Sequence, residues 1–268
     1  MAINFNNVKE WYIGNSEVTA LSINGVTAWQ KNVVEDFLHT PMFVENPGST
    51  SFDIQIKKDS SSAPTLTVEY STDKTNWSSI TTSTTAQNIA VPANGRTYLR
   101  CNCNTWGNSS RFNGINFTGN GSVGGNIMSL IYGSSFTGNE TSFKSSSDKY
   151  TFRDLFNGNT HLVSVKDLKM PCTALNEGCY YYMFRNCTSL TEAPELPATT
   201  LVTSCYNLMF NGCTSLNSIK VAFTSWTSSC TANWVTSVAS SGTFYCPSTL
   251  TQTTGNSYIP SGWTIVTT

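Results

Sequence analysis

Cysteine thiols give this chain its widest choice of chemistry, because they can form disulfides, bind zinc or act as nucleophiles. The 268 residues contain nine cysteines. Five of them lie in or beside a repeat, at Cys172, Cys179, Cys187, Cys205 and Cys213. Repeated positions favour small buried hydrophobic side chains, and disulfides remain the alternative. Zinc is disfavoured because no CxxC pair occurs.

Two histidines are the obvious candidates for general-base catalysis, but neither His39 nor His161 lies near a candidate nucleophile in the sequence. His161 occupies a repeat position that Ser189 and Ser215 fill in the later copies. That equivalence predicts a solvent-facing turn position.

The carboxylates of Glu192 and Glu195 are three residues apart and could form an acid–base pair. Their repeat equivalents are Ser218 and Val221, so the pair does not recur and a solvated edge is the preferred interpretation. We therefore expect no catalytic residues, no cofactor and no bound metal, and we look for function in the surfaces of the protein.

An internal repeat dominates the second half of the chain. CYYYMFRNCTSL at 179–190 and CYNLMFNGCTSL at 205–216 are identical at eight of twelve positions and are offset by 26 residues. A degenerate copy, LFNGNTHL at 155–162, lies 28 residues before the first of them. Three successive layers of a stack are therefore predicted.

Within each copy, the apolar positions predict how the layer is built. Cys179, Met183, Phe184 and Cys187 are spaced i, i+4, i+5 and i+8, which is one face of a short helix. The apolar rhythm of residues 190–196 predicts a short strand after it. A single layer of this kind cannot bury its own faces, so stacking must stabilise it.

A few positions differ between the two copies while the framework stays constant. Variable exposed positions are where a stack of repeats can place specificity. The candidates for partner binding are Tyr181, Tyr182, Arg185, Asn207 and Asn211. Aromatic planes beside amides suit sugars or protein partners. Simple amphipathic surface cover remains the alternative.

The first half of the chain predicts two smaller β regions. Residues 1–36 contain apolar runs on both sides of Asn24-Gly25, which is a strong hairpin signal. This unit has more apolar residues than it can bury alone, so Trp11, Tyr12 and Trp29 are candidates for attachment to another subunit, with docking on the neighbouring domain as the alternative. Residues 37–124 alternate with a period of two and predict an antiparallel β-sandwich.

Charge and hydropathy limit the partners. The formal net charge is −1 and basic residues are scattered singly, which disfavours nucleic acid. No run approaches about eighteen apolar residues, so membrane insertion is not expected. The first fourteen residues, MAINFNNVKEWYIG, lack the pattern of a secretory signal, so we expect synthesis in a cytoplasm.

The run FRNCTSLTEAPELPATTL at 184–201, with CYNLMFNGCTSL after it, resembles the BspA-like leucine-rich repeats of gut Bacteroides proteins and their phages. The resemblance covers residues 125–268. It implies a solenoid that serves as a non-catalytic binding or adhesion platform and that lies on the virion surface in phages. The preceding β domain and opening hairpin are similar to what precedes such arrays in phage structural proteins.

Together these observations predict a mostly-β, multidomain chain: a hairpin module at 1–36, a sandwich of the immunoglobulin or fibronectin type at 37–124, and a short leucine-rich-repeat solenoid at 125–268. We expect a virion structural protein of the head or tail fibre or decoration type. Its expected partners are other virion proteins and a host-surface glycan or protein. Fibre-type proteins are commonly homo-oligomers, with a trimer as one option. A bacterial cell-surface adhesin is the main alternative, and a glycan-processing enzyme is a remote one.

Overall fold

The computed structural model describes residues 35–227 and 229–268, together with the backbone of four short strands between Tyr12 and Gln30. The chain divides into two compact units, Met1–Asp36 and Phe37–Thr268, which are described separately. Strands supply most of the regular structure, and the α-helix α1 (Ser129–Tyr132) is four residues long. The prediction of a mostly-β chain with several sheets is confirmed.

The first unit contains two antiparallel strand pairs. β1 (Tyr12–Ile13) pairs with β2 (Ser16–Glu17), and β3 (Ala20–Ile23) pairs with β4 (Val26–Gln30). In the second pair, Ala20 lies opposite Gln30 and Ile23 lies opposite Val26. The predicted hairpin is confirmed in its strand pairing.

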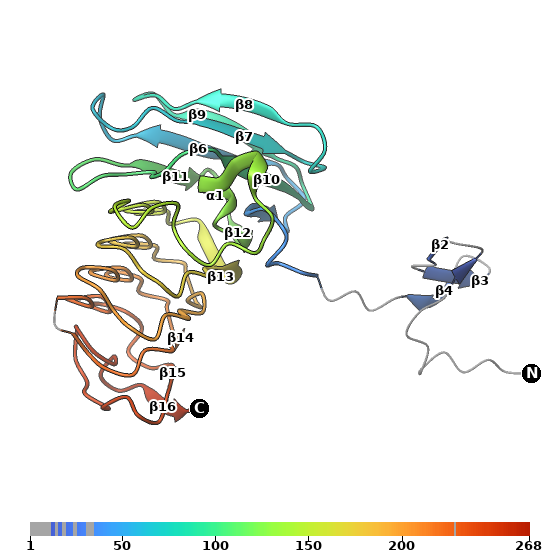
Figure 1. The fold of residues 1–268 in the computed structure, drawn as a ribbon. Coiled ribbons are helices and arrows are strands. Elements are labelled where there is room, and N and C mark those ends of the chain that lie inside the picture. Colours follow the sequence, from blue (N-terminus) through green and yellow to red (C-terminus); the bar gives the residue numbers. More distant parts are fainter. Residues whose placement is uncertain (1–11, 14–15, 18–19, 24–25, 31–34, 228) are drawn as a thin grey trace, which may run out of the picture. The chain divides into compact units, whose positions relative to one another are not determined.

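Two sheets form the upper part of the second unit (Figure 1). The six-stranded sheet has the order β13-β12-β5-β10-β7-β8, and the three-stranded sheet has the order β11-β6-β9. Their strands are β5 (Phe43–Asn46), β6 (Phe52–Lys58), β7 (Thr67–Ser71), β8 (Ser78–Thr81), β9 (Gln87–Val91), β10 (Gly95–Cys101), β11 (Asn113–Phe117), β12 (Gly121–Asn126) and β13 (Leu162–Lys169).

Alternation of side chains explains why these segments are strands. In β6, Phe52, Ile54 and Ile56 are buried while the residues between them are not, as the period of two predicts. Ile54 lies opposite Ile89 and Ile56 lies opposite Ile115, so apolar side chains meet across neighbouring strands. Both sheets contribute to one hydrophobic core that continues into residues 127–268.

A parallel strand pair helps to join the sheets to the repeats, together with backbone hydrogen bonds such as that from the Ile115 N–H to the Leu155 carbonyl. β12 pairs with β13, with Gly121 opposite Leu162 and Asn126 opposite Lys169. Parallel pairing requires a long crossover connection, which residues 127–161 provide. The predicted boundary between residues 124 and 125 therefore lies inside β12, and residues 37–268 form a single compact unit.

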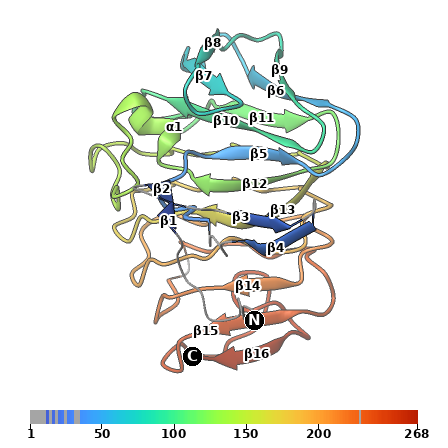
Figure 2. The same cartoon turned by 90° about the vertical axis from the view of Figure 1, so that its right-hand side faces the viewer.

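Residues 150–268 form successive layers, whose short strands lie one below another along one side (Figure 2). The predicted short helices are wrong, because residues 179–187 and 205–213 are runs of tight turns. Tyr182 and Leu208 have positive φ values of 59° and 54°, a backbone conformation that interrupts a right-handed helix.

Of the two close copies, only the second is followed by the predicted strand. There β14 (Ser218–Lys220) pairs with β15 (Thr243–Cys246), and β15 pairs with β16 (Thr264–Thr267). In the first copy, Glu192 and Leu196 make isolated bridges to the next layer. Pro194 and Pro197 lack N–H groups, which explains why that segment makes no continuous ladder.

Tryptophans close the C-terminal end of the stack. The indole N–H groups of Trp226, Trp234 and Trp263 donate to backbone carbonyls of the last layers at 2.7, 2.8 and 2.8 Å. Each ring thus covers apolar surface while its polar atom is satisfied. Of the described residues, no helix is long and apolar enough to cross a membrane.

Candidate binding surface

The repeats present one continuous surface, which we call the turn ladder: residues 150–158, 178–187, 204–213 and 229–237. Its backbone amides alternate in direction. The Met183 N–H donates within its own turn, to the Tyr180 carbonyl at 3.2 Å, whereas the Tyr182 N–H donates to the Asn207 carbonyl of the next layer at 3.1 Å. Every second residue therefore ties neighbouring layers together.

This alternation gives the turn ladder a four-residue period. One residue in four adopts positive φ, and two adjacent residues in four point inward, such as Met183 and Phe184. The positive-φ residues of the ladder are Tyr150, Asp154, Gly158, Gly178, Tyr182, Asn186, Ser204, Leu208, Gly212, Asn233 and Ser237. Such residues recur at matching positions of successive layers, so the layers share one backbone conformation.

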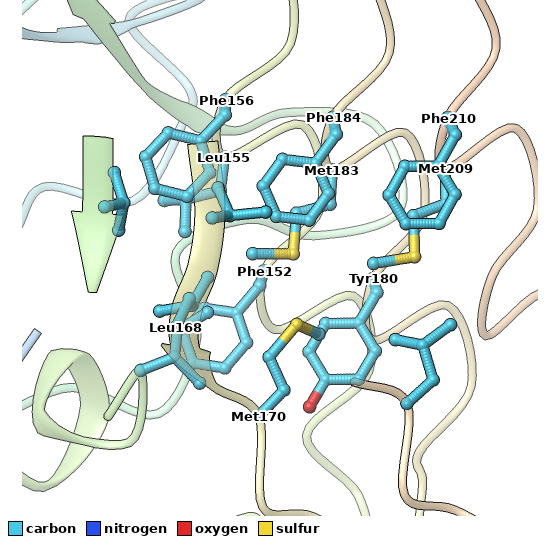
Figure 3. Packing of buried hydrophobic residues seen from close by; sticks show 14 of the residues in the cluster. Phe152, Leu155, Phe156, Leu168, Met170, Tyr180, Met183, Phe184, Met209 and Phe210 are labelled. Atoms are coloured by element: carbon cyan, nitrogen blue, oxygen red, sulfur yellow. The ribbon is translucent and has the colours of Figure 1, made fainter. Parts of the chain in front are cut away.

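The inner side of the turn ladder is a pair of aromatic stacks (Figure 3). Phe184 lies between Phe156 and Phe210, with ring centroids 5.5 and 5.7 Å away and nearly parallel planes. Tyr180 and Tyr206 form part of the second stack, 5.9 Å apart. Both tyrosines are buried, so they pack the interior and are not available to a partner.

Thiols complete the inner side. Cys187 donates to the Phe156 carbonyl at 3.1 Å, and Cys213 makes the equivalent bond to the Phe184 carbonyl at 2.9 Å. Burial raises the pKa of Cys213 to about 12 and that of Cys187 well above its usual value. All nine cysteines are free, and within the described residues no three metal-binding side chains cluster. The repeat thiols are packing groups, as predicted.

The five candidate binding residues lie together on two neighbouring layers. Tyr181 and Tyr182 contact each other edge to face, with centroids 4.1 Å apart, and the Arg185 guanidinium lies 4.9 Å from the Tyr182 ring centroid. The next layer supplies Asn207 and Asn211, whose carbonyls accept the N–H groups of Tyr182 and Asn186. All five side chains are half-buried.

Sequence reasoning missed the contribution of the preceding layer. Arg153 lies 5.0 Å from the Tyr181 ring centroid, and its Nε donates to Asp154 at 2.9 Å. Tyr150 makes an edge contact with Tyr181 at 6.2 Å. Arg153 lies 28 residues before Tyr181, so it occupies the equivalent position of the degenerate copy. Aligning that copy with the other two would have identified this part of the site.

Partial burial shifts the pKa values of two groups on this surface. Burial raises the pKa of Tyr181 to about 12, and the neighbouring Tyr182 adds to the shift. Burial also raises the pKa of Asp154, against the opposing effects of Arg153 and Asn157. At neutral pH Tyr181 is therefore uncharged, and it offers a hydroxyl group and an aromatic face beside the arginines.

The other chemistry candidates are engaged elsewhere. Glu195 accepts a hydrogen bond from Lys220 Nζ at 2.7 Å, which fits an ion-paired surface edge. His161 Nδ1 lies 3.0 Å from Asn120 Oδ1, and His39 Nε2 lies 3.3 Å from Asn139 Oδ1. These contacts bring neither histidine to a nucleophile.

The candidate attachment residues belong to the first unit. Trp11 lies outside the described residues. Tyr12 and Trp29 belong to β1 and β4, for which the backbone alone is described. Their attachment role stays a prediction.

Comparisons of this chain with protein-family models, with curated proteins and with solved structures find no match. The functional proposal therefore depends on what the surface residues themselves present.

Proposed function

We propose that this protein is a non-catalytic structural component of a phage particle, and that its turn ladder binds another virion protein or a host-surface glycan. The observation that carries the proposal is the grouping of Arg153, Tyr181, Tyr182, Arg185 and Asn207 on one surface. Aromatic faces flanked by guanidinium and amide groups are typical of recognition surfaces.

The backbone supports a recognition role. Each layer is fixed by hydrogen bonds to its neighbours and by buried rings, so the outer side chains vary without changing the framework. Tyr182, for example, aligns with Asp154 in one neighbouring layer and with Leu208 in the other, and all three have positive φ. This separation of framework from surface suits a binding platform.

The resemblance to BspA-like leucine-rich repeats supplies the finer part of the proposal. Residues 125–268 would be a short member of that repeat class, with turn runs in place of helices. The virion surface is then the proposed location, and the unit at 1–36 is the proposed attachment module. A homo-oligomer, with a trimer as one option, completes this proposal.

A binding assay with the full chain tests the ladder. We expect the double variant Tyr181→Ala/Tyr182→Asn to lose binding to immobilised particle proteins or to a host-surface glycan panel. The matched control is Tyr245→Asn, which removes a half-buried tyrosine from β15 and should leave binding unchanged. If both variants fold and bind equally well, the turn ladder is not the binding surface.

The proposed location on the virion and the proposed lack of catalysis each need a separate measurement. Antibody labelling of purified particles should decorate the virion, whereas labelling of bacterial cells alone would favour the adhesin. Release of new reducing ends from host polysaccharide by the purified chain would contradict the non-catalytic assignment.

A further inference from the structure

Arg185 differs from the other arginines of the chain. The described residues include all five, and four of them pair with a carboxylate at 2.8 to 3.4 Å. These pairs are Arg96–Glu45, Arg100–Glu69, Arg111–Asp59 and Arg153–Asp154. Within the same part of the chain, Arg185 makes no ion pair. Its charge is therefore available to a group from outside.

The surroundings of Arg185 do not use its hydrogen-bonding capacity. Its Nε is buried and has no acceptor. The Arg185 charge lies close enough to Asp154 to lower the pKa of that carboxyl. The Asp154 oxygens, however, already accept hydrogen bonds from Arg153 Nε at 2.9 Å and from Asn157 Nδ2 at 2.7 Å. Two guanidinium groups share one carboxylate, which leaves one positive charge.

An unused acceptor lies on the next layer. Asn207 Oδ1 is buried and has no donor, and the Asn207 carbonyl binds the N–H of Tyr182, over whose ring Arg185 lies. Asn207 Oδ1 has no exposed surface, so a ligand from outside contacts the half-buried Arg185 side chain and the rings of Tyr181 and Tyr182 instead. The surface thus lacks an anionic acceptor at Arg185.

We propose that the turn ladder binds a sugar that carries a carboxylate, such as a uronic or sialic acid residue. The carboxylate pairs with the Arg185 guanidinium, and the apolar face of the sugar packs on Tyr181 and Tyr182. Neighbouring layers are 5.5 to 5.9 Å apart between stacked rings, a spacing comparable with one pyranose ring.

A sugar fits these groups better than an acidic peptide does. In a sugar acid the carboxylate is fixed relative to the apolar face of one rigid ring, so both can meet Arg185 and the tyrosine rings at the same time. A glutamate side chain must lose rotamer freedom to present its carboxylate in a fixed direction. This inference rests on the proposed glycan-binding function and specifies its substrate class.

Calorimetry with the full chain tests the inference, with sialyllactose, trigalacturonate, lactose and tetraglutamate as probes. We expect at least one acidic sugar to bind more tightly than lactose and tetraglutamate, and its affinity to fall as salt rises. Arg185→Gln should weaken that binding at least about tenfold and leave any lactose binding unchanged. The control Arg111→Gln removes an ion-paired, more exposed arginine and should have no effect.

The outcomes separate the two proposals. Equal binding of lactose and the acidic sugars, or full affinity in Arg185→Gln, would overturn the carboxylate assignment while leaving glycan binding intact. Tighter binding of tetraglutamate would overturn the choice of a sugar. If no sugar binds, and Tyr181→Ala/Tyr182→Asn leaves binding to particle proteins unchanged, the proposed function fails as well.

Discussion

The strands at 43–126 and the turn ladder bury similar side chains through different backbone geometry. In β6 and its neighbours, amides bond sideways to adjacent strands and side chains alternate, so that Ile54 and Ile56 point into one core. In the ladder, amides alternate between their own turn and the next layer, and inward residues come in pairs such as Met183 and Phe184. The direction of the backbone hydrogen bonds therefore determines how often along the chain a side chain points inward.

The outer surfaces of the two regions also differ. On the six-stranded sheet, Arg100 lies 3.9 Å from the Trp77 ring centroid and makes two hydrogen bonds to Glu69. In the ladder, Arg185 lies over Tyr182 without a carboxylate of its own. Arg100 is therefore paired within the protein, whereas Arg185 makes no ion pair among the described residues and is the cation that we assign to the ligand.

Alkaline titration should give the largest separation between the two regions. Burial raises the pKa of Cys205 and Cys213 to about 12, whereas an unfolded thiol ionises near pH 9. Above about pH 9 the unfolded chain loses these protons and the folded chain keeps them. Stability is therefore fully present below about pH 9 and falls by about 3 kcal/mol per pH unit for the two thiols together as pH rises toward 12.

Urea unfolding at successive pH values above 9 measures this loss, and hydrogen exchange should show the ladder amides opening before those of β6. The variant Cys205→Ser/Cys213→Ser should remove the share of these two thiols from the pH dependence and leave the share of other buried thiols such as Cys187. Rapid labelling of most thiols in the native protein at neutral pH would contradict their burial.

Truncating one stacked ring should have the next largest effect. Phe184→Ala removes a fully buried ring with a parallel neighbour on each side, and we expect it to lower the free energy of unfolding by about 3–5 kcal/mol. The matched change in the sheets is Phe117→Ala, since Phe117 contacts one tilted ring, that of Phe52 at 5.7 Å. We expect the smaller loss there. An equal or larger loss at Phe117 would show that stacking between layers adds little stability.

The contrast between the two regions also explains what the sequence could predict. Strands such as β6 and β9 were predicted because a period of two has a single structural meaning. The inward residues of the repeats were also identified, since burial of Cys179, Met183 and Phe184 depends on spacing alone. Their conformation was not, because a four-residue period in turns resembles the 3.6-residue period of a helix.

Parts of the candidate site were beyond reach of the sequence for a similar reason. Tyr181, Tyr182 and Arg185 were found because two near-identical copies exposed their variation. Arg153 was missed because its copy is degenerate, and the pairing of β12 with β13 was missed because it joins segments about forty residues apart. A repeating spacing of residues can be recognised within one segment of the sequence. Contacts between layers can be predicted only after the segments that form those layers have been aligned with one another.

The smallest predicted effect concerns a single backbone position. Tyr182 adopts φ 59°, which costs a bulky residue about 1 kcal/mol, and Asn233, in a later layer, occupies an equivalent position with an amino acid that tolerates it. Tyr182→Asn should therefore raise the free energy of unfolding by up to about 1 kcal/mol while weakening sugar binding. Thermal unfolding and calorimetry on the same sample measure both. A gain in stability with unchanged binding would mean that this tyrosine serves only as surface cover, whereas opposite changes would show that strain is retained at the ladder for recognition.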